Sequence, residues 1–138
     1  MPPTTSGTML PYVISAQQTI PRRGLPAAAL TAVLGSIGTA DRAVARGDVP
    51  AAHQALMDAQ NVVLVLRGSL NHTAFPELTE RLDQLYGFLL RELGQANIDK
   101  DRERLTSIVP VICTLRDAFA EASKAPTDAP ETTGGWQG

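Results

Sequence analysis

The sequence has few of the residues on which metal and redox sites depend. It contains one cysteine, Cys113, and two histidines, His53 and His72, among 138 residues. A single cysteine cannot form an internal disulfide, and this supply of ligands excludes a zinc site built from several cysteines. Neither histidine has a glutamate three residues before it, as the Glu-x-x-His motif of di-iron bundles requires. We therefore expect neither a metal nor a cofactor.

Long apolar runs and an excess of one charge are also absent. The longest strictly apolar run is Val62 to Leu66, far short of the ~20 residues that span a bilayer. Lys and Arg number 12 against 14 Asp and Glu, so the formal net charge is −2. No basic surplus is present to attract nucleic acid or an anionic membrane, and the N-terminus lacks the pattern of a secretory signal. We expect a soluble, cytoplasmic, single-domain protein.

Catalytic motifs are missing as well. The sequence contains no phosphate-binding G-x-x-x-x-G-K-[ST], no G-x-G-x-x-G and no G-x-S-x-G. Cys113 follows Ile112 in an apolar pattern, where a cysteine is more often a small core residue than a nucleophile. We therefore expect a protein that is not an enzyme.

Apolar residues recur every three or four positions along the middle of the chain, which predicts helices. Four are expected, at about residues 26–46, 48–70, 76–97 and 101–122. Their predicted core stripes are, in order, Leu30, Val33, Ile37, Ala40 and Val44; Ala52, Leu56, Ala59, Val63, Leu66 and Leu70; Leu78, Leu82, Leu85 and Leu89; and Leu105, Ile108, Ile112, Leu115, Phe119 and Ala122.

Particular residues indicate where these helices begin and end. Gly47 is placed to end the first helix and Asp48 to cap the second. Asn97 is expected to end the third helix in the left-handed conformation, and Asp99 or Asp101 to open the fourth. Pro110 is expected to kink or break the fourth helix, because a proline ring clashes with the carbonyl four residues earlier.

The connections are short, and short connections make successive helices antiparallel. The predicted fold is all-α, an up-down-up-down four-helix bundle with an N-terminal arm or short helix packed on it. We expect residues 1–24 to form this partly docked arm, residues 25–123 the bundle, and residues 124–138, rich in Pro, Thr and Gly, a disordered tail.

The second and third helices carry more apolar residues than one core stripe needs. Beside the stripes lie Met57, Val62, Leu64 and Val65 on the second helix, and Tyr86, Leu90 and Leu93 on the third. An apolar groove between helices can capture an amphipathic helix or an extended peptide. These residues could equally broaden the core, cover the N-terminal arm, or form the interface of a structural homodimer.

Three stretches resemble the flagellin export chaperones, the FliS family. Residues 58–71, DAQNVVLVLRGSLN, are similar to the family's second-helix pattern KAQ-x-II-x-x-L-x-x-SL(D/N). Residues 85–97, LYGFLLRELGQAN, resemble LY-x-(Y/F)-x-x-R-x-L-x-x-AN. Residues 115–119, LRDAF, resemble the final-helix pattern L-R-(D/E)-x-(W/F). The three occur in the family's order and spacing across about residues 12–123.

This resemblance implies a bacterial cytoplasmic export chaperone without catalytic activity. Such a protein binds the C-terminal segment of flagellin, prevents premature polymerisation and assists delivery to the flagellar type III export apparatus. In the family an early tyrosine lies in a segment that covers part of the binding surface, and Tyr12 stands in that place. We expect Tyr12 and Ile14 to be the covering residues. The expected client-binding residues are Met57, Gln60, Asn61, Val62, Leu64, Val65, Tyr86, Leu90 and Leu93.

A second hypothesis is a diverged helical adaptor or regulator that binds another flagellar protein. An anti-sigma factor or a co-chaperone would be its partner, and an export-gate component is a further candidate. We expect the protein to be a monomer or a weak homodimer.

Overall fold

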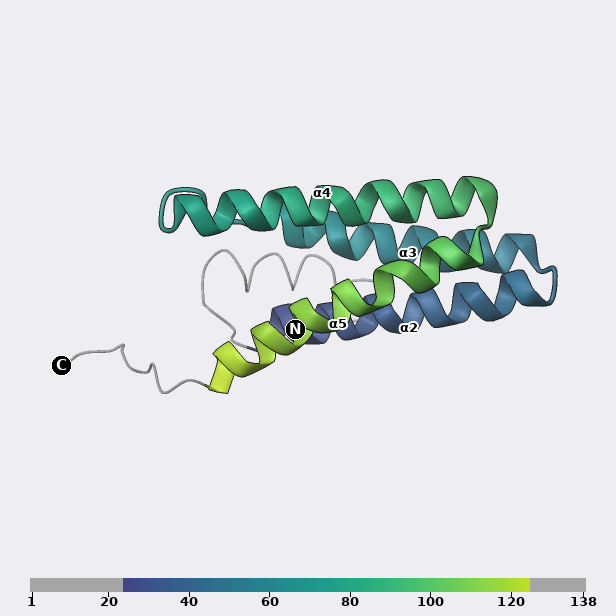
Figure 1. Cartoon of the computed structure of the whole chain (residues 1–138), viewed down its shortest axis with the longest axis horizontal. Coiled ribbons are helices and arrows are strands. Elements are labelled where there is room, and N and C mark those ends of the chain that lie inside the picture. Colours follow the sequence, from purple (N-terminus) through teal and green to yellow (C-terminus); the bar gives the residue numbers. More distant parts are fainter. Residues whose placement is uncertain (1–23, 125–138) are drawn as a thin grey trace, which may run out of the picture.

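The computed structural model describes residues 24–124, which form four helices in an antiparallel bundle (Figure 1). They are α2 (Leu25–Ala45), α3 (Val49–Gly68), α4 (Pro76–Asp99) and α5 (Arg102–Lys124). Each helix packs on the next one in the chain, and α5 also packs on α2, which closes the ring. The predicted all-α, up-down-up-down bundle is confirmed, while the predicted arm and nearly all of the predicted tail lie outside the described residues.

The turn between α2 and α3 follows the sequence pattern. Gly47 adopts a left-handed φ of 77°, a conformation that costs glycine little because it has no Cβ. The Oδ1 of Asp48 accepts a hydrogen bond of 3.2 Å from the N–H of Ala51. Pro50 occupies the first turn of α3, where its missing N–H removes no helical hydrogen bond. The predicted helix end and cap are both confirmed.

The end of α4 differs from the prediction. Asn97 is still helical and buried, and Lys100 is the residue in the left-handed conformation, with a φ of 52°. The Nδ2 of Asn97 donates to His53 Nδ1 at 3.0 Å, and Lys100 Nζ donates to Asn97 Oδ1 at 2.9 Å. The amide of Asn97 therefore links α4 to α3 instead of ending the helix. The carboxylate of Asp101 then caps α5, as predicted, by accepting from the N–H of Arg104 at 3.1 Å.

The core stripes of α2 and α3 lie largely where the sequence places them. Fully buried side chains from these two helices include Leu30, Val33, Leu56, Val63 and Leu66. On α5 the stripe is buried at Leu105, Ile108 and Ile112 and only half-buried at Leu115 and Phe119, while Ala122 is exposed. The core therefore thins toward the C-terminal end of α5.

The core stripe of α4 is not the predicted leucine row. Leu89 is buried, but Leu82 and Leu85 are half-buried and Leu78 is 56% exposed. Other buried residues of this helix are Thr79, Tyr86, Leu93, Ala96 and Asn97. Leu82 shares one side of α4 with Tyr86, Leu89 and Leu93, at intervals of four, three and four, and it packs against the core. The predicted seam is therefore confirmed at Leu89, only partly buried at Leu82 and Leu85, and wrong at Leu78.

α5 runs through Pro110 without interruption, so the predicted break is wrong. Whether the helix axis bends there stays a prediction. A proline has no N–H, so the carbonyl of Thr106, four residues earlier, loses its helical donor.

Arginine–carboxylate pairs join neighbouring helices. Arg67 on α3 donates to both carboxylate oxygens of Asp83 on α4, at 2.8 and 3.3 Å. Arg102 on α5 donates likewise to Asp41 on α2, at 2.8 and 3.2 Å. These hydrogen bonds lower the pKa of each carboxyl below its ordinary value, because they favour the charged form.

Candidate functional site

One face of α4 is turned toward α5. Leu78, Leu82, Leu85, Leu89 and Glu92 recur at intervals of three and four residues, so they share one side of the helix. Glu92 accepts a hydrogen bond of 2.9 Å from Arg104 Nη1 of α5, which fixes the direction of this side. The exposed and half-buried leucines of α4 therefore point toward the side on which α5 lies.

The matching face of α5 is also apolar. Val111, Leu115, Ala118 and Ala122 share one side of the helix with Arg104, the partner of Glu92. Val111 and Leu115 are half-buried, and the two alanines are exposed. The charged pair therefore marks one end of two apolar stripes that continue along both helices.

The two helices separate along these stripes. Figure 1 shows α5 leaving its turn beside α4 and then crossing toward α2, and α4 and α5 are the pair of neighbours that packs least. Their apolar residues are therefore incompletely covered by each other. We call this surface the α4–α5 face; its residues are Leu78, Leu82, Leu85, Val111, Leu115, Ala118 and Ala122.

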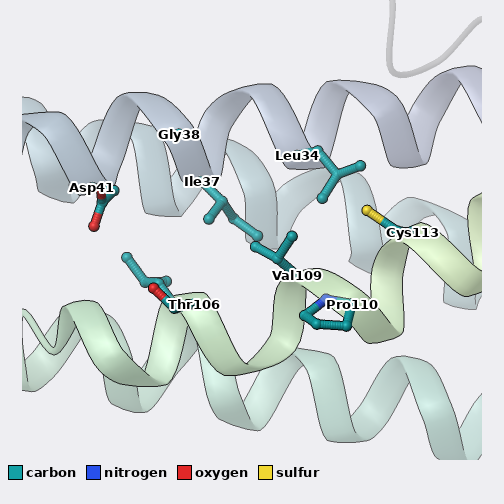
Figure 2. Close-up of a pocket in the computed structure, with 9 residues that line it drawn as sticks. Leu34, Ile37, Gly38, Asp41, Thr106, Val109, Pro110 and Cys113 are labelled. Carbon is teal, nitrogen blue, oxygen red and sulfur yellow. The ribbon is translucent and has the colours of Figure 1, made fainter.

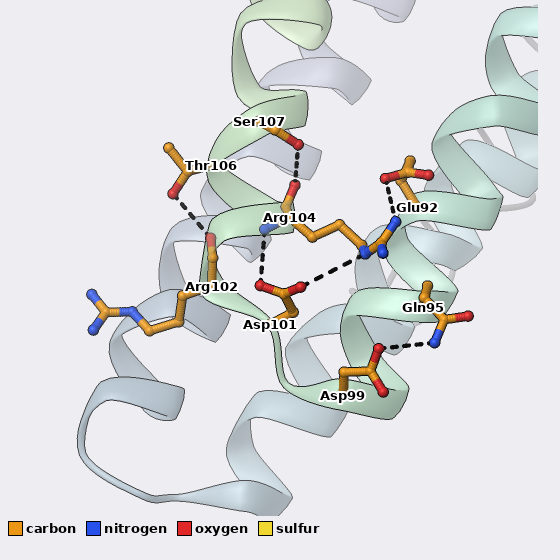
Figure 3. A network of polar contacts seen from close by, with 8 residues as sticks. All are labelled: Glu92, Gln95, Asp99, Asp101, Arg102, Arg104, Thr106 and Ser107. Carbon is orange, nitrogen blue, oxygen red and sulfur yellow. Dashed lines mark hydrogen bonds and ion pairs between the residues drawn. The ribbon is translucent and has the colours of Figure 1, made fainter.

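A polar network holds the closed end of the α4–α5 face (Figure 3). Arg104 bonds Glu92 through Nη1 at 2.9 Å, and its Nε lies 3.9 Å from an oxygen of Asp101. That Nε is buried, and no residue among 24–124 accepts a hydrogen bond from it. The Arg104–Glu92 pair joins the start of α5 to α4, while the rest of α5 diverges.

The residues predicted to bind a client on α3 do not form one patch. Met57, Gln60 and Leu64 lie on the side of α3 that faces α4, where a Cβ on Gly94 would be 4.0 Å from Gln60 Nε2. Leu64 is 53% exposed, Met57 and Gln60 are half-buried, and the Oε1 of Gln60 accepts no hydrogen bond from the described part of the chain.

The remaining predicted residues of α3 point elsewhere. Asn61 is exposed on the outer surface of the helix. Val62 and Val65 are half-buried on the other flank, and Val62 packs against the core. The structure therefore separates these three residues from the side that contains Leu64.

The predicted residues of α4 are largely interior. Tyr86 is 1% exposed and Leu93 is fully buried, so the prediction that they belong to an outer apolar face is wrong. Leu90 is half-buried and packs against the core. Burial raises the pKa of the Tyr86 hydroxyl well above its ordinary value, because a phenolate would lose its hydration. Tyr12 and Ile14, the predicted covering residues, lie outside the described residues.

Sequence reasoning missed the α4–α5 face because it assigned the leucines of α4 to the core. A row of leucines at intervals of three and four indicates an apolar side of a helix, and it does not distinguish a core from a binding surface. Which of these leucines stay uncovered depends on where α5 diverges from α4, and the sequence gives no local signal for that.

Within residues 24–124, no three His, Cys, Asp or Glu side chains are grouped so that they could hold a metal ion. In the same part of the chain, every helix is too short or too polar to cross a membrane. The features that this part of the molecule does offer are apolar surfaces and interhelical ion pairs.

Comparison with known proteins identifies the family. The family model described as flagellar protein FliS matches residues 9–126. A flagellar secretion chaperone FliS of Bacillus subtilis is 28% identical over 99 residues, which cover 72% of this chain and 73% of the relative.

Two further relatives match over a shorter stretch. The flagellar secretion chaperones FliS of Vibrio cholerae and Salmonella typhimurium are 27% and 28% identical over 77 and 79 residues. Each match covers 56% of this chain, and it spans only 57% and 58% of the two relatives. Since the family model covers most of the chain, including all four described helices, this protein belongs to the FliS family.

Proposed function

We propose that this protein is a cytoplasmic chaperone that binds the C-terminal segment of flagellin before export. In this role it would prevent premature polymerisation and assist delivery to the flagellar type III export apparatus. The observation that carries the proposal is the α4–α5 face, which leaves large aliphatic side chains incompletely covered at one end of the bundle. Membership of the FliS family, whose relatives are named as flagellar secretion chaperones, supports the same role.

The α4–α5 face suits an unfolded client. A segment that folds on binding loses conformational entropy, so it needs an extended apolar surface on a rigid body. Exposed and half-buried leucines on two helices provide such a surface at the margin of the core. Burying the exposed half of one leucine contributes about 0.8–1.5 kcal/mol to binding.

A second contact area is proposed on α3, around Leu64 and Met57, with Gln60 and Asn61 as hydrogen-bonding partners of the client backbone. Val62 and Val65 are proposed on the other flank of α3, and Leu90 on α4. A client that wraps around the bundle would reach both areas, as coupled folding and binding allows.

The N-terminal residues are proposed to cover the α4–α5 face until the client arrives. Because successive helices alternate in direction, α2 begins at the end of the bundle where α4 begins and α5 ends (Figure 1). The ten residues from Ile14 to Gly24 can extend about 33–36 Å, which is enough to place Tyr12 and Ile14 on this face.

The test is isothermal titration with the C-terminal ~40–60 residues of flagellin from the same organism. We expect 1:1 binding with a negative heat-capacity change, which marks burial of apolar surface. Leu78→Asp should weaken binding at least tenfold without unfolding the bundle, because Leu78 is 56% exposed.

Leu64→Asp is the matched variant, since Leu64 is 53% exposed on a different helix. Weaker binding with Leu64→Asp alone would move the site to α3. No flagellin binding by the folded wild-type protein would refute the chaperone proposal and favour an adaptor for another flagellar protein. A tight dimer in gel filtration that takes up no client would favour the structural homodimer.

A further inference from the structure

A separate apolar groove lies between α2 and α5, away from the α4–α5 face. It has a volume of about 560 Å³, and its lining comes from both helices (Figure 2). The lining residues are Leu34, Ile37, Gly38, Asp41, Leu105, Thr106, Val109, Pro110 and Cys113. The volume is large enough for an aromatic side chain, and the lining is mostly apolar.

Two features of the groove fit an indole group in particular. Gly38 leaves space in the wall formed by α2, because it has no side chain. Pro110 leaves the carbonyl of Thr106 without its helical donor, and both residues line the groove. A buried tryptophan needs an apolar site for its ring and one acceptor for its N–H. The groove offers the apolar site, and the carbonyl of Thr106 is the proposed acceptor.

The chain contains one tryptophan, Trp136, and it lies outside the family match, which ends at residue 126. We propose that Trp136 occupies the α2–α5 groove of its own chain, with its indole N–H directed to the carbonyl of Thr106. This contact would be a feature of this protein beyond the shared chaperone fold, and it does not depend on which client the α4–α5 face binds.

The length of the connecting segment supports this assignment. Cys113 and Val109 lie 11 and 15 residues before Lys124 along α5, a distance of about 17–23 Å. Trp136 lies 12 residues after Lys124, and 12 residues span at most about 40–43 Å, so the connecting segment is long enough to bring Trp136 back to the groove. The effective concentration within one chain is about 1 mM for short linkers. A contact with an intrinsic Kd below about 1 mM would then be occupied most of the time.

Fluorescence of the full-length protein tests the proposal, because Trp136 is the sole tryptophan. We expect its emission to be blue-shifted relative to the urea-unfolded chain and independent of protein concentration. Gly38→Leu should fill the groove, displace Trp136 into water and so shift the emission to the red. The new side chain can be accommodated, because a Cβ at Gly38 approaches only the flexible end of Arg42, at 3.4 Å. Gly35→Leu is the matched control, since a Cβ there meets nothing within 4 Å and Gly35 does not line the groove.

Alkylation of Cys113 by iodoacetamide provides an independent measurement, because Cys113 is the sole cysteine and lines the groove. If Trp136 fills the groove about three quarters of the time, Trp136→Ala should accelerate alkylation about fourfold. Gln137→Ala, a change in the same segment, should leave the rate unchanged. An emission maximum equal to that of the unfolded chain, or equal alkylation rates with and without Trp136, would overturn the proposal. A blue shift that grows with protein concentration would also overturn it, because it would place Trp136 in a second copy.

Discussion

Truncating one leucine at each end of α4 should separate folding from client binding. Leu93 is fully buried, whereas Leu78 is 56% exposed on the α4–α5 face. Leu93→Ala removes the same atoms as Leu78→Ala, so the two variants differ only in their surroundings. We expect Leu93→Ala to lower the free energy of unfolding by about 2–5 kcal/mol, because it leaves a cavity in the core. Leu78→Ala should change it by less than about 0.5 kcal/mol.

Urea unfolding, followed by circular dichroism at 222 nm, measures this difference. With an m-value of about 1.5 kcal/mol/M, the midpoint of Leu93→Ala should fall by about 1.3–3.3 M, and that of Leu78→Ala by less than about 0.4 M. Titration with the flagellin segment should show the reverse order. Leu78→Ala should weaken binding about four- to twelvefold, from the loss of about 0.8–1.5 kcal/mol, whereas Leu93→Ala should bind normally under conditions where it is folded.

Two results would refute this reasoning. A loss of stability from Leu78→Ala as large as that from Leu93→Ala would place Leu78 in the core, as the leucine pattern alone suggests. Normal client binding by Leu78→Ala would remove the α4–α5 face from the proposed function, even if the difference in stability is confirmed.

Acid should destabilise the protein below about pH 4. Asp41 and Asp83 have a lowered pKa in the folded state, so as the pH falls these carboxylates take up protons in the unfolded chain before they do so in the folded protein. The unfolded state is then favoured by its greater proton binding. The double variant Asp41→Asn, Asp83→Asn should show a flatter profile of urea midpoint between pH 5 and 2; an unchanged profile would contradict the assignment. Burial raises the pKa of Tyr86, so its hydroxyl should stay protonated above pH 10 for as long as the bundle is folded. In Tyr12→Phe, where Tyr86 is the sole tyrosine, the tyrosinate absorbance at 295 nm should therefore stay constant until unfolding; a rise near pH 10 in the folded protein would contradict this. Asn97→Ala should lower the free energy of unfolding by about 0.5–1.5 kcal/mol in urea titrations, because it removes the hydrogen bonds of the amide to His53 and Lys100; a neutral effect would show that water replaces the amide.

Much of the fold could be predicted from local signals. The cap at Asp48, the left-handed glycine at Gly47 and the apolar period of α3 each depend on residues close in sequence, so the pattern alone was sufficient. The end of α4 could not be predicted, because Asn97 is held by His53, 44 residues away. A contact of this range overrides the local preference of asparagine for a helix end.

The candidate site was harder to predict than the fold, because it depends on how helices diverge. The sequence indicates which residues are apolar, and the bundle determines which of them remain uncovered. Tyr86 and Leu93 were expected on a second apolar side and are buried, whereas Leu78 was expected in the core and is exposed. Leu78 is exposed because it lies at the end of α4 from which α5 has diverged, whereas Tyr86 and Leu93 share the covered side of α4 with Leu89.

Different residues of α4 can serve stability and binding. Thr79, Tyr86, Leu89 and Leu93 are buried, and the Arg67–Asp83 and Arg104–Glu92 ion pairs join α4 to α3 and α5. On the α4–α5 face, Leu82 and Leu115 also pack against the core, whereas Leu78 is 56% exposed and contributes least to it. Exposed apolar surface on a folded domain often marks an interaction site. The proposed client would therefore cover Leu78 and its neighbours without any change in the buried residues of α4.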